Sequence, residues 1–89
     1  MTTKREYFIE MTDVYGGEPN YSWVRRYKTR AVSERGALQK LQRRHGYNWR
    51  KTHDDGESVS YRSNSGSTCC FITEWADEYH ENYLHVEEL

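Results

Sequence analysis

Alternating apolar and polar residues in the first third of the chain predict two strands joined by a turn. In a strand over residues 5–14, Tyr7, Ile9 and Met11 share one face, because successive strand side chains point to opposite sides. Gly16 and Gly17 predict a turn over residues 15–20. A second strand over residues 21–32 places on one face Tyr21, Trp23, Arg25, Tyr27, Thr29 and Ala31. The opposite face carries three cations, so we expect the aromatic face to lie toward the helix that follows.

The pattern changes to helical spacing between Ser33 and Gly46. Ser33 is suited to accept a hydrogen bond from a free N–H of the first turn, and Gly46 can adopt the left-handed conformation that ends a helix. The apolar stripe is narrow and consists of Ala37, Leu38 and Leu41. We therefore expect one amphipathic helix on the sheet, with Gly36 permitting close approach of a strand.

Three further strands are predicted after the helix, over residues 47–52, 57–63 and 68–75, with turns at 53–56 and 64–67. The second of these has only Val59 and Tyr61 as large residues, which favours an exposed or edge position. The third is the most apolar and is expected at the centre of the sheet. The order ββαβββ predicts an α+β fold: a small antiparallel sheet of about five strands packed on one main helix.

The C-terminal tail differs in composition from the rest of the chain. It is acidic, and Trp75, Tyr79 and Tyr83 recur at helical spacing, which predicts a short acidic helix over residues 76–84. A frayed terminus is the alternative. With 89 residues, the chain is expected to form a single domain over 1–89, with a core over 1–75 and the acidic aromatic tail over 76–89.

Charge is distributed unevenly, although the formal net charge is only −1. Every Lys and Arg except Arg62 lies before residue 52, and nine of the 14 Asp and Glu lie after it. If the two halves stay apart in the fold, the molecule has a positive and a negative side. If their strands interleave, much of this charge is neutralised by cross-strand pairs.

No motif with catalytic or metal-binding spacing is present. The four His and two Cys form neither a C-x₂-C pair nor an H-x₃-H or HExxH motif. Cys69 and Cys70 are strand neighbours that point to opposite faces, so we expect two reduced thiols, one of them in the core. Asp54 and Asp55 precede a glycine and are typical of a turn. These features indicate a protein that is not an enzyme, with no cofactor and no metal.

Two classes of binding function remain, one for protein and one for nucleic acid. Tyr and Trp are enriched at binding hot spots, and 15% of the residues are aromatic. The predicted protein-binding residues are Tyr15, Trp23, Arg26, Tyr27, Glu78, Tyr79, Glu81 and Tyr83. The alternative is a nucleic-acid surface that combines phosphate contacts with stacking. Its predicted residues are Arg26, Lys28, Arg30, Arg35, Lys40 and Arg43.

One segment, residues 13–27, reads D-x-Y-G-G-E-x-N-Y-x-W-V followed by R-R-Y, and an R-G-A helix start follows at residues 35–37. In these features the chain resembles a class of short bacteriophage-encoded proteins, over roughly residues 7–75. The resemblance carries no functional residues. It implies an accessory protein in the host bacterial cytoplasm. Because no apolar run approaches ~20 residues, we expect no membrane contact, and we expect a monomer or a homodimer. Phage proteins of this kind often inhibit host complexes by non-enzymatic binding, including CRISPR effectors, so an anti-defence role is expected.

Overall fold

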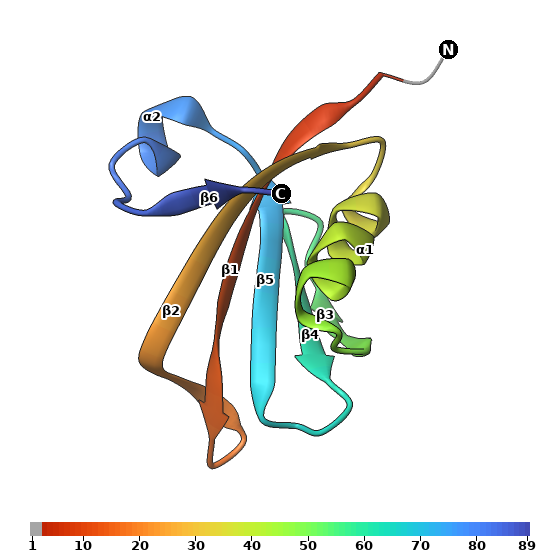
Figure 1. The fold of residues 1–89 in the computed structure, drawn as a ribbon, viewed down its shortest axis with the longest axis vertical. Coiled ribbons are helices and arrows are strands. Elements are labelled where there is room, and N and C mark those ends of the chain that lie inside the picture. Colours follow the sequence, from red (N-terminus) through yellow and green to blue (C-terminus); the bar gives the residue numbers. More distant parts are fainter. Residues whose placement is uncertain (1–2) are drawn as a thin grey trace.

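The long N-terminal hairpin is the frame of the molecule. In the computed structural model, which describes residues 3–89, strand β1 (Arg5–Tyr15) pairs antiparallel with β2 (Glu18–Ala31). The predicted alternation therefore produces the expected hairpin, although β2 begins three residues earlier than predicted. Both strands run along most of the longest axis of the molecule (Figure 1).

The sheet contains six strands rather than the five predicted. The remaining elements are α1 (Glu34–His45), β3 (Trp49–Asp54), β4 (Ser58–Ser63), β5 (Thr68–Glu74), α2 (Asp77–His80) and β6 (Val86–Glu88). The strand order is β3-β4-β5-β1-β2-β6. All neighbours are antiparallel except β2 and β6, which are parallel, so the fold is α+β with a mixed sheet.

Helix α1 begins and ends at the predicted residues. The Ser33 side chain accepts a hydrogen bond from the Gly36 backbone N–H at 3.2 Å. Gly46 has φ 74°, and its N–H donates to the carbonyl of Gln42 at 2.7 Å. A Cβ at Gly36 would lie 3.3 Å from the Cβ of Ala31, which confirms that this glycine lets the helix approach β2 closely.

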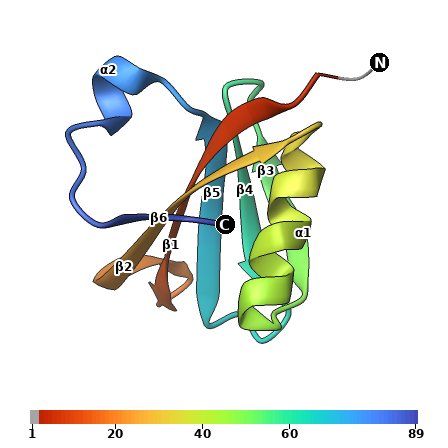
Figure 2. The ribbon, with the colours of Figure 1, turned by 45° about the horizontal axis from the view of Figure 1, so that its top comes forward.

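The core lies between α1 and one face of the sheet (Figure 2). It joins the apolar stripe of the helix to alternate residues of β1, β2, β4 and β5. Its largest fully buried apolar side chains are Tyr27, Ile9, Met11, Leu41 and Ile72. The predicted helix-facing side of β2 is thus confirmed from Tyr27 to Ala31, but Tyr21 and Trp23 on the same predicted face are exposed.

Strand β4 was expected at an edge, and this prediction is wrong. β3 pairs with the outer side of β4, and β5 pairs with its inner side. Val59 and Tyr61 are consequently buried beneath α1 rather than exposed. The central position expected for the 68–75 strand is confirmed, because β5 lies between β4 and β1.

The tail forms one helical turn and one strand instead of a helix over 76–84. Helix α2 lies on the sheet face opposite α1, where the ring of His80 stacks on Phe8 with centroids 4.2 Å apart. Tyr83 stacks on the same phenyl ring at 5.4 Å. The chain then turns, and β6 runs along the outer edge of β2 (Figure 1). The tail therefore covers both a face and an edge of the sheet.

The basic and acidic halves of the chain are partly interleaved. Arg44 of α1 contacts Glu87 of β6 at 3.0 Å, and Arg5 of β1 contacts Glu74 of β5 at 3.0 Å. Within the hairpin, Lys28 contacts Glu6 at 3.3 Å. The fold therefore neutralises part of the charge asymmetry and leaves the outer side of α1 as a cationic region.

Candidate binding surface

A wide bulge interrupts the hairpin near its turn. Thr12 of β1 pairs with Val24 of β2, but Val14 pairs with Pro19, so Asp13 alone faces the segment 20–23. Extra residues in one strand bend it and re-aim its side chains. The segment 20–23 therefore leaves the regular alternation that places Tyr27 in the core.

Two polar side chains of β1 hold the bulge in place. The hydroxyl of Thr12 accepts from the backbone N–H of Tyr21 at 3.1 Å and donates to the carbonyl of Trp23 at 2.8 Å. The carboxylate of Asp13 accepts from the backbone N–H of Ser22 at 2.9 Å and from the Asn20 amide at 3.0 Å. Hydrogen bonding with Ser22 is the largest cause, and hydrogen bonding with Asn20 the second, of a pKa of Asp13 that lies well below its usual value.

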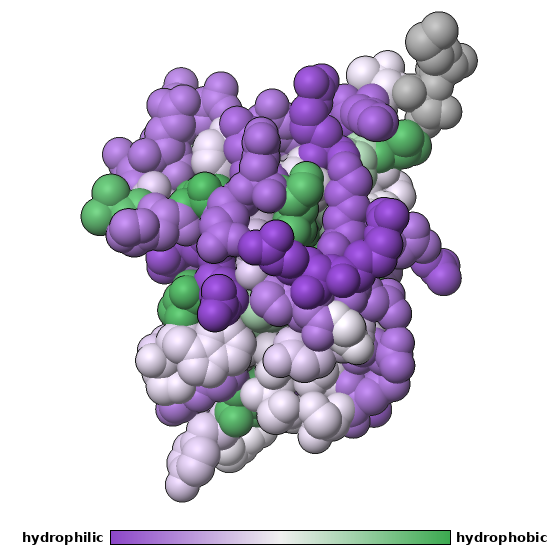
Figure 3. Space-filling view, in the orientation of Figure 1, coloured by the Kyte–Doolittle hydropathy of each residue, from purple (hydrophilic) through white to green (hydrophobic). Residues whose placement is uncertain are grey.

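The bulge presents aromatic rings to solvent. Tyr21 has φ 57°, a left-handed conformation that costs an L-residue about 1–2 kcal/mol. Its side chain is 53% exposed, that of Trp23 is 39% exposed and that of Tyr15 at the hairpin tip is 78% exposed. We call Tyr15, Tyr21 and Trp23 the aromatic bulge. Figure 3 shows pale atoms, the colour of mid-scale residues such as Tyr and Trp, gathered over the lower part of the molecule.

Beside the aromatic bulge lies a half-open hollow of about 520 Å³. Trp23 and Arg25 of β2 line one side, and His45 and Tyr47, at the end of α1, line another. The imidazole of His45 stacks on Tyr47 at 5.8 Å, and its Nε2 lies 2.6 Å from the buried hydroxyl of Tyr27. Burial, followed by the charge of Arg25, lowers the pKa of His45, which favours the neutral ring that can accept a hydrogen bond from the tyrosine hydroxyl.

The structure separates the predicted protein-binding residues. Tyr15 and Trp23 are exposed on the aromatic bulge, but Tyr27 is only 1% exposed, because it lies beneath α1. Its side chain therefore forms core and hydrogen-bonds His45 instead of offering a contact surface. Arg26 is half-buried, paired with Glu10 at 3.2 Å.

The predicted tail residues lie beside one residue of the aromatic bulge, because Tyr79 and Tyr83 line a hollow together with Tyr21. Glu78, Tyr79 and Glu81 are exposed around α2. Tyr83 is half-buried, and the guanidinium of Arg26 lies over its ring at 4.4 Å from the centroid. The ring of Tyr83 is thus partly covered, and the exposed part of the tail forms an acidic surface next to the aromatic bulge.

The predicted nucleic-acid set is divided in a similar way. Arg26 and Lys28 are half-buried and engaged, since the Lys28 ammonium also lies 4.7 Å from the Trp75 ring centroid. Lys40 donates to the carbonyl of Arg30 at 2.6 Å. Three of the predicted side chains remain exposed without an ion pair among residues 3–89, namely Arg30, Arg35 and Arg43.

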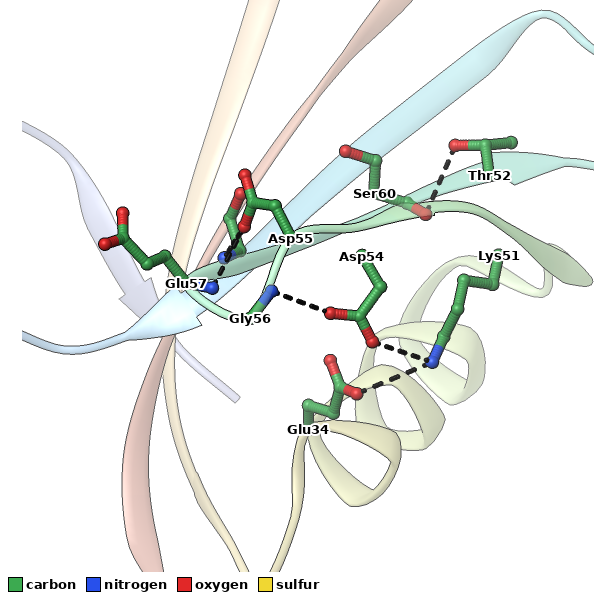
Figure 4. A network of polar contacts seen from close by, with 9 residues as sticks. Glu34, Lys51, Thr52, Asp54, Asp55, Gly56, Glu57 and Ser60 are labelled. Carbon is green, nitrogen blue, oxygen red and sulfur yellow. Dashed lines mark hydrogen bonds and ion pairs between the residues drawn. The ribbon is translucent and has the colours of Figure 1, made fainter.

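The acidic residues at the end of β3 and just after it stabilise the turn that leads to β4. Figure 4 shows Lys51 between Glu34 and Asp54, at 3.8 and 3.4 Å. Asp54 accepts from the Gly56 N–H, and Asp55 accepts from the backbone of the next residues, which lowers the pKa of both carboxyls. The prediction of a turn is confirmed, although Asp54 still belongs to β3.

The remaining chemistry-bearing residues do not converge. Cys70 lies in the core, which agrees with the prediction of one core thiol, but Cys69 is buried as well, and burial raises the pKa of both thiols. Within residues 3–89 no three His, Cys, Asp or Glu side chains are grouped to hold a metal ion. No helix in that range is long and apolar enough to cross a membrane.

Sequence reasoning missed Tyr21 as a surface aromatic and Asp13 as a residue that fixes the bulge. A uniform strand over 21–32 treated Tyr21 as one more inward-facing residue. The available signal was Asn20 and Ser22, because Asn and Asp are depleted in strands and bond readily to nearby backbone. Comparison with family models, with curated proteins and with solved structures found no match for this chain.

Proposed function

We propose that this chain is a non-enzymatic binding protein that occupies a surface of a bacterial protein complex. The observation that carries the proposal is the aromatic bulge. Tyr21 is a non-glycine residue in a strained backbone conformation whose ring is nevertheless left largely in water. Such strain persists only where the surroundings enforce it, and it is concentrated at functional sites.

The chemistry of the bulge suits protein recognition. Tyr and Trp bring large contact areas with few rotatable bonds, and they are enriched among residues that dominate binding energy. Trp23 also borders the hollow that contains Arg25 and Tyr47, so a partner side chain inserted there would meet both an aromatic wall and a cation. We expect Tyr21 and Trp23 to act as anchors, and Tyr15 to contact the rim.

The similarity of segment 13–37 to short phage proteins supports a partner in the host cytoplasm. A defence complex of the CRISPR type is the partner that this origin favours, and the proposed action is stoichiometric inhibition. The exposed acidic residues Glu78 and Glu81 would add contacts to a basic surface of such a complex.

The test is capture of a partner from bacterial lysate, identification by mass spectrometry and measurement of its affinity with purified components. Tyr21→Ala combined with Trp23→Ala should weaken binding by at least ~30-fold, which is the loss expected if only one of the two residues contributes about 2 kcal/mol. Arg35→Ala with Arg43→Ala is the matched control on α1, outside the aromatic bulge. Equal affinity of the aromatic variant and the wild type would refute the role of the bulge.

A second candidate function is nucleic-acid binding by the outer side of α1 and the end of β2, favoured by the exposed Arg35 and Arg43 of the helix and Arg30 of the strand. Here the two control substitutions would become the damaging ones. Binding should weaken steeply with added salt, because phosphate contacts release counterions. The absence of a shift of labelled single- or double-stranded DNA at about 50 mM salt would eliminate this candidate.

A further inference from the structure

The outer edge of β2 presents backbone hydrogen-bonding groups, and different segments of the chain bond to different parts of this edge. The carbonyl of Lys28 accepts from the N–H of Leu89 at 3.0 Å, and the carbonyl of Arg30 accepts from the ammonium of Lys40 at 2.6 Å. Because backbone groups alternate along a strand, those of Val24 point to the same outward side.

The resident occupant of this edge is the parallel strand β6, and its contacts show what the edge recognises. Glu87 contacts Arg44 at 3.0 Å, so a carboxylate is favoured at this position. Two residues further, Leu89 packs on the core, and its carbonyl accepts from the Thr29 hydroxyl at 3.4 Å. The edge thus combines a backbone ladder, a cation for an acid and an apolar seat for an aliphatic side chain.

The resident strand uses only part of the edge. Its ladder begins at Arg26, because His85 just before it has φ 61° and turns the chain away from β2. Val24 therefore lies beyond the β6 ladder. The ion pair between Arg44 and Glu87 is exposed to solvent, where such pairs contribute little. The occupant is short, strained at its entry and weakly held.

The hollow described above lies next to the place where the resident strand β6 begins. Val24 lines it together with Trp23, Tyr47 and His85. A segment that remained extended before the position of Val86 would pair with Val24 and extend into this hollow. A foreign strand can therefore make contacts that the resident strand cannot.

We propose that the β2 edge is a binding site for an extended acidic segment of another protein, which adds to the sheet parallel to β2 and displaces β6. The segment carries an acidic residue beside Arg44 and an aliphatic residue two positions later. Strand addition of this kind takes its affinity from main-chain hydrogen bonds and its specificity from side-chain seats. The site adjoins the aromatic bulge, but its test does not depend on that proposal.

The test uses a fluorescent acetylated peptide, Leu-Thr-Val-Glu-Glu-Leu, and fluorescence anisotropy with the full chain. Leu89→Asp removes the apolar anchor of β6 and leaves the β2 edge intact. We expect this variant to bind the peptide at least ~10-fold more tightly than wild type, because an intramolecular competitor acts at an effective concentration near millimolar. An unchanged far-UV circular dichroism spectrum verifies its fold.

The specificity control reverses one charge on each side. Adding Arg44→Glu to Leu89→Asp should weaken binding of the acidic peptide at least ~5-fold, and a peptide with Lys at the first Glu position should recover it. Three results would overturn the proposal. The first is no saturable binding of the peptide to Leu89→Asp below about 1 mM, and the second is equal affinity of the peptide for Leu89→Asp and for the wild type. The third is a peptide affinity that the added Arg44→Glu leaves unchanged. Dimerisation of the wild type that Leu89→Asp abolishes would instead assign the edge to a second copy.

Discussion

The hydrogen bond between Tyr27 and His45 offers a direct test of the structure. Tyr27→Phe removes one hydroxyl from a ring that is 1% exposed and leaves its aromatic packing in place. The hydroxyl lies 2.6 Å from the Nε2 of His45, and the two rings meet edge to face at 5.6 Å. The substitution therefore removes a hydrogen bond without creating a large cavity.

The expected cost follows from what the deletion leaves behind. A typical intramolecular hydrogen bond contributes about 0.5–1.5 kcal/mol, and an unpaired buried partner raises the loss toward 2 kcal/mol. His45 is half-buried, so water replaces part of the lost bond, and we expect a loss of about 1–1.5 kcal/mol. For a domain of this size, 1 kcal/mol lowers Tm by about 4–8 °C.

The assay is thermal and urea unfolding at pH 7.5, followed by circular dichroism. Tyr7→Phe and Tyr61→Phe are matched controls, because both rings are buried in the same core but neither hydroxyl has a hydrogen-bond partner among residues 3–89. Burial, followed by the negative charge of Glu34, raises the pKa of Tyr61 to about 12, so its hydroxyl stays protonated at the pH of the assay. We expect both controls to lie within about 0.5 kcal/mol of wild type. A Tyr27→Phe loss no larger than theirs would refute the reasoning.

Three further predictions concern pH, the helix start and the bulge. Burial lowers the pKa of His45 and His80 below 6.5, so the unfolded chain binds more protons than the folded chain. The free energy of unfolding should therefore fall as pH drops from about 7 to 5, and the same urea midpoint throughout this window would contradict the prediction. Gly36→Val should lower Tm markedly, because its Cβ would crowd Ala31, whereas a variant as stable as wild type would show that the helix can shift. Asp13→Ala should release the bulge, making limited proteolysis faster within residues 15–23 and leaving cleavage elsewhere unchanged.

Local signals in the sequence predicted the elements that depend on local physics. Ser33 and Gly46 mark the ends of α1, because capping involves only residues within one turn of the helix. The hairpin and the central position of β5 followed in the same way from alternation and apolar content. The ends of α1 and the hairpin are determined by neighbours in the sequence, whereas the central position of β5 was inferred from its high apolar content.

The features that sequence reasoning missed depend on partners far along the chain. β4 is buried because β3 pairs outside it, which its own composition did not show. The aromatic bulge depends on Thr12 and Asp13 in the opposite strand, so a pattern read along β2 alone placed Tyr21 inward. The tail is helical for one turn only, because its last residues pair with β2, where the N–H of Leu89 donates to the carbonyl of Lys28.

The wrapping of the tail across the sheet sets an order for events during synthesis. A chain made from its N-terminus completes β1 and β2 long before β6 exists, so the edge of β2 stays bare until residues 77–88 have emerged. Phe8, which α2 and Tyr83 cover in the finished fold, is exposed over the same interval. A bare edge beside an aromatic face is a template for association with other chains. Chains truncated before α2 should therefore aggregate, and the tail acts as the protein's own chaperone for its longest strand.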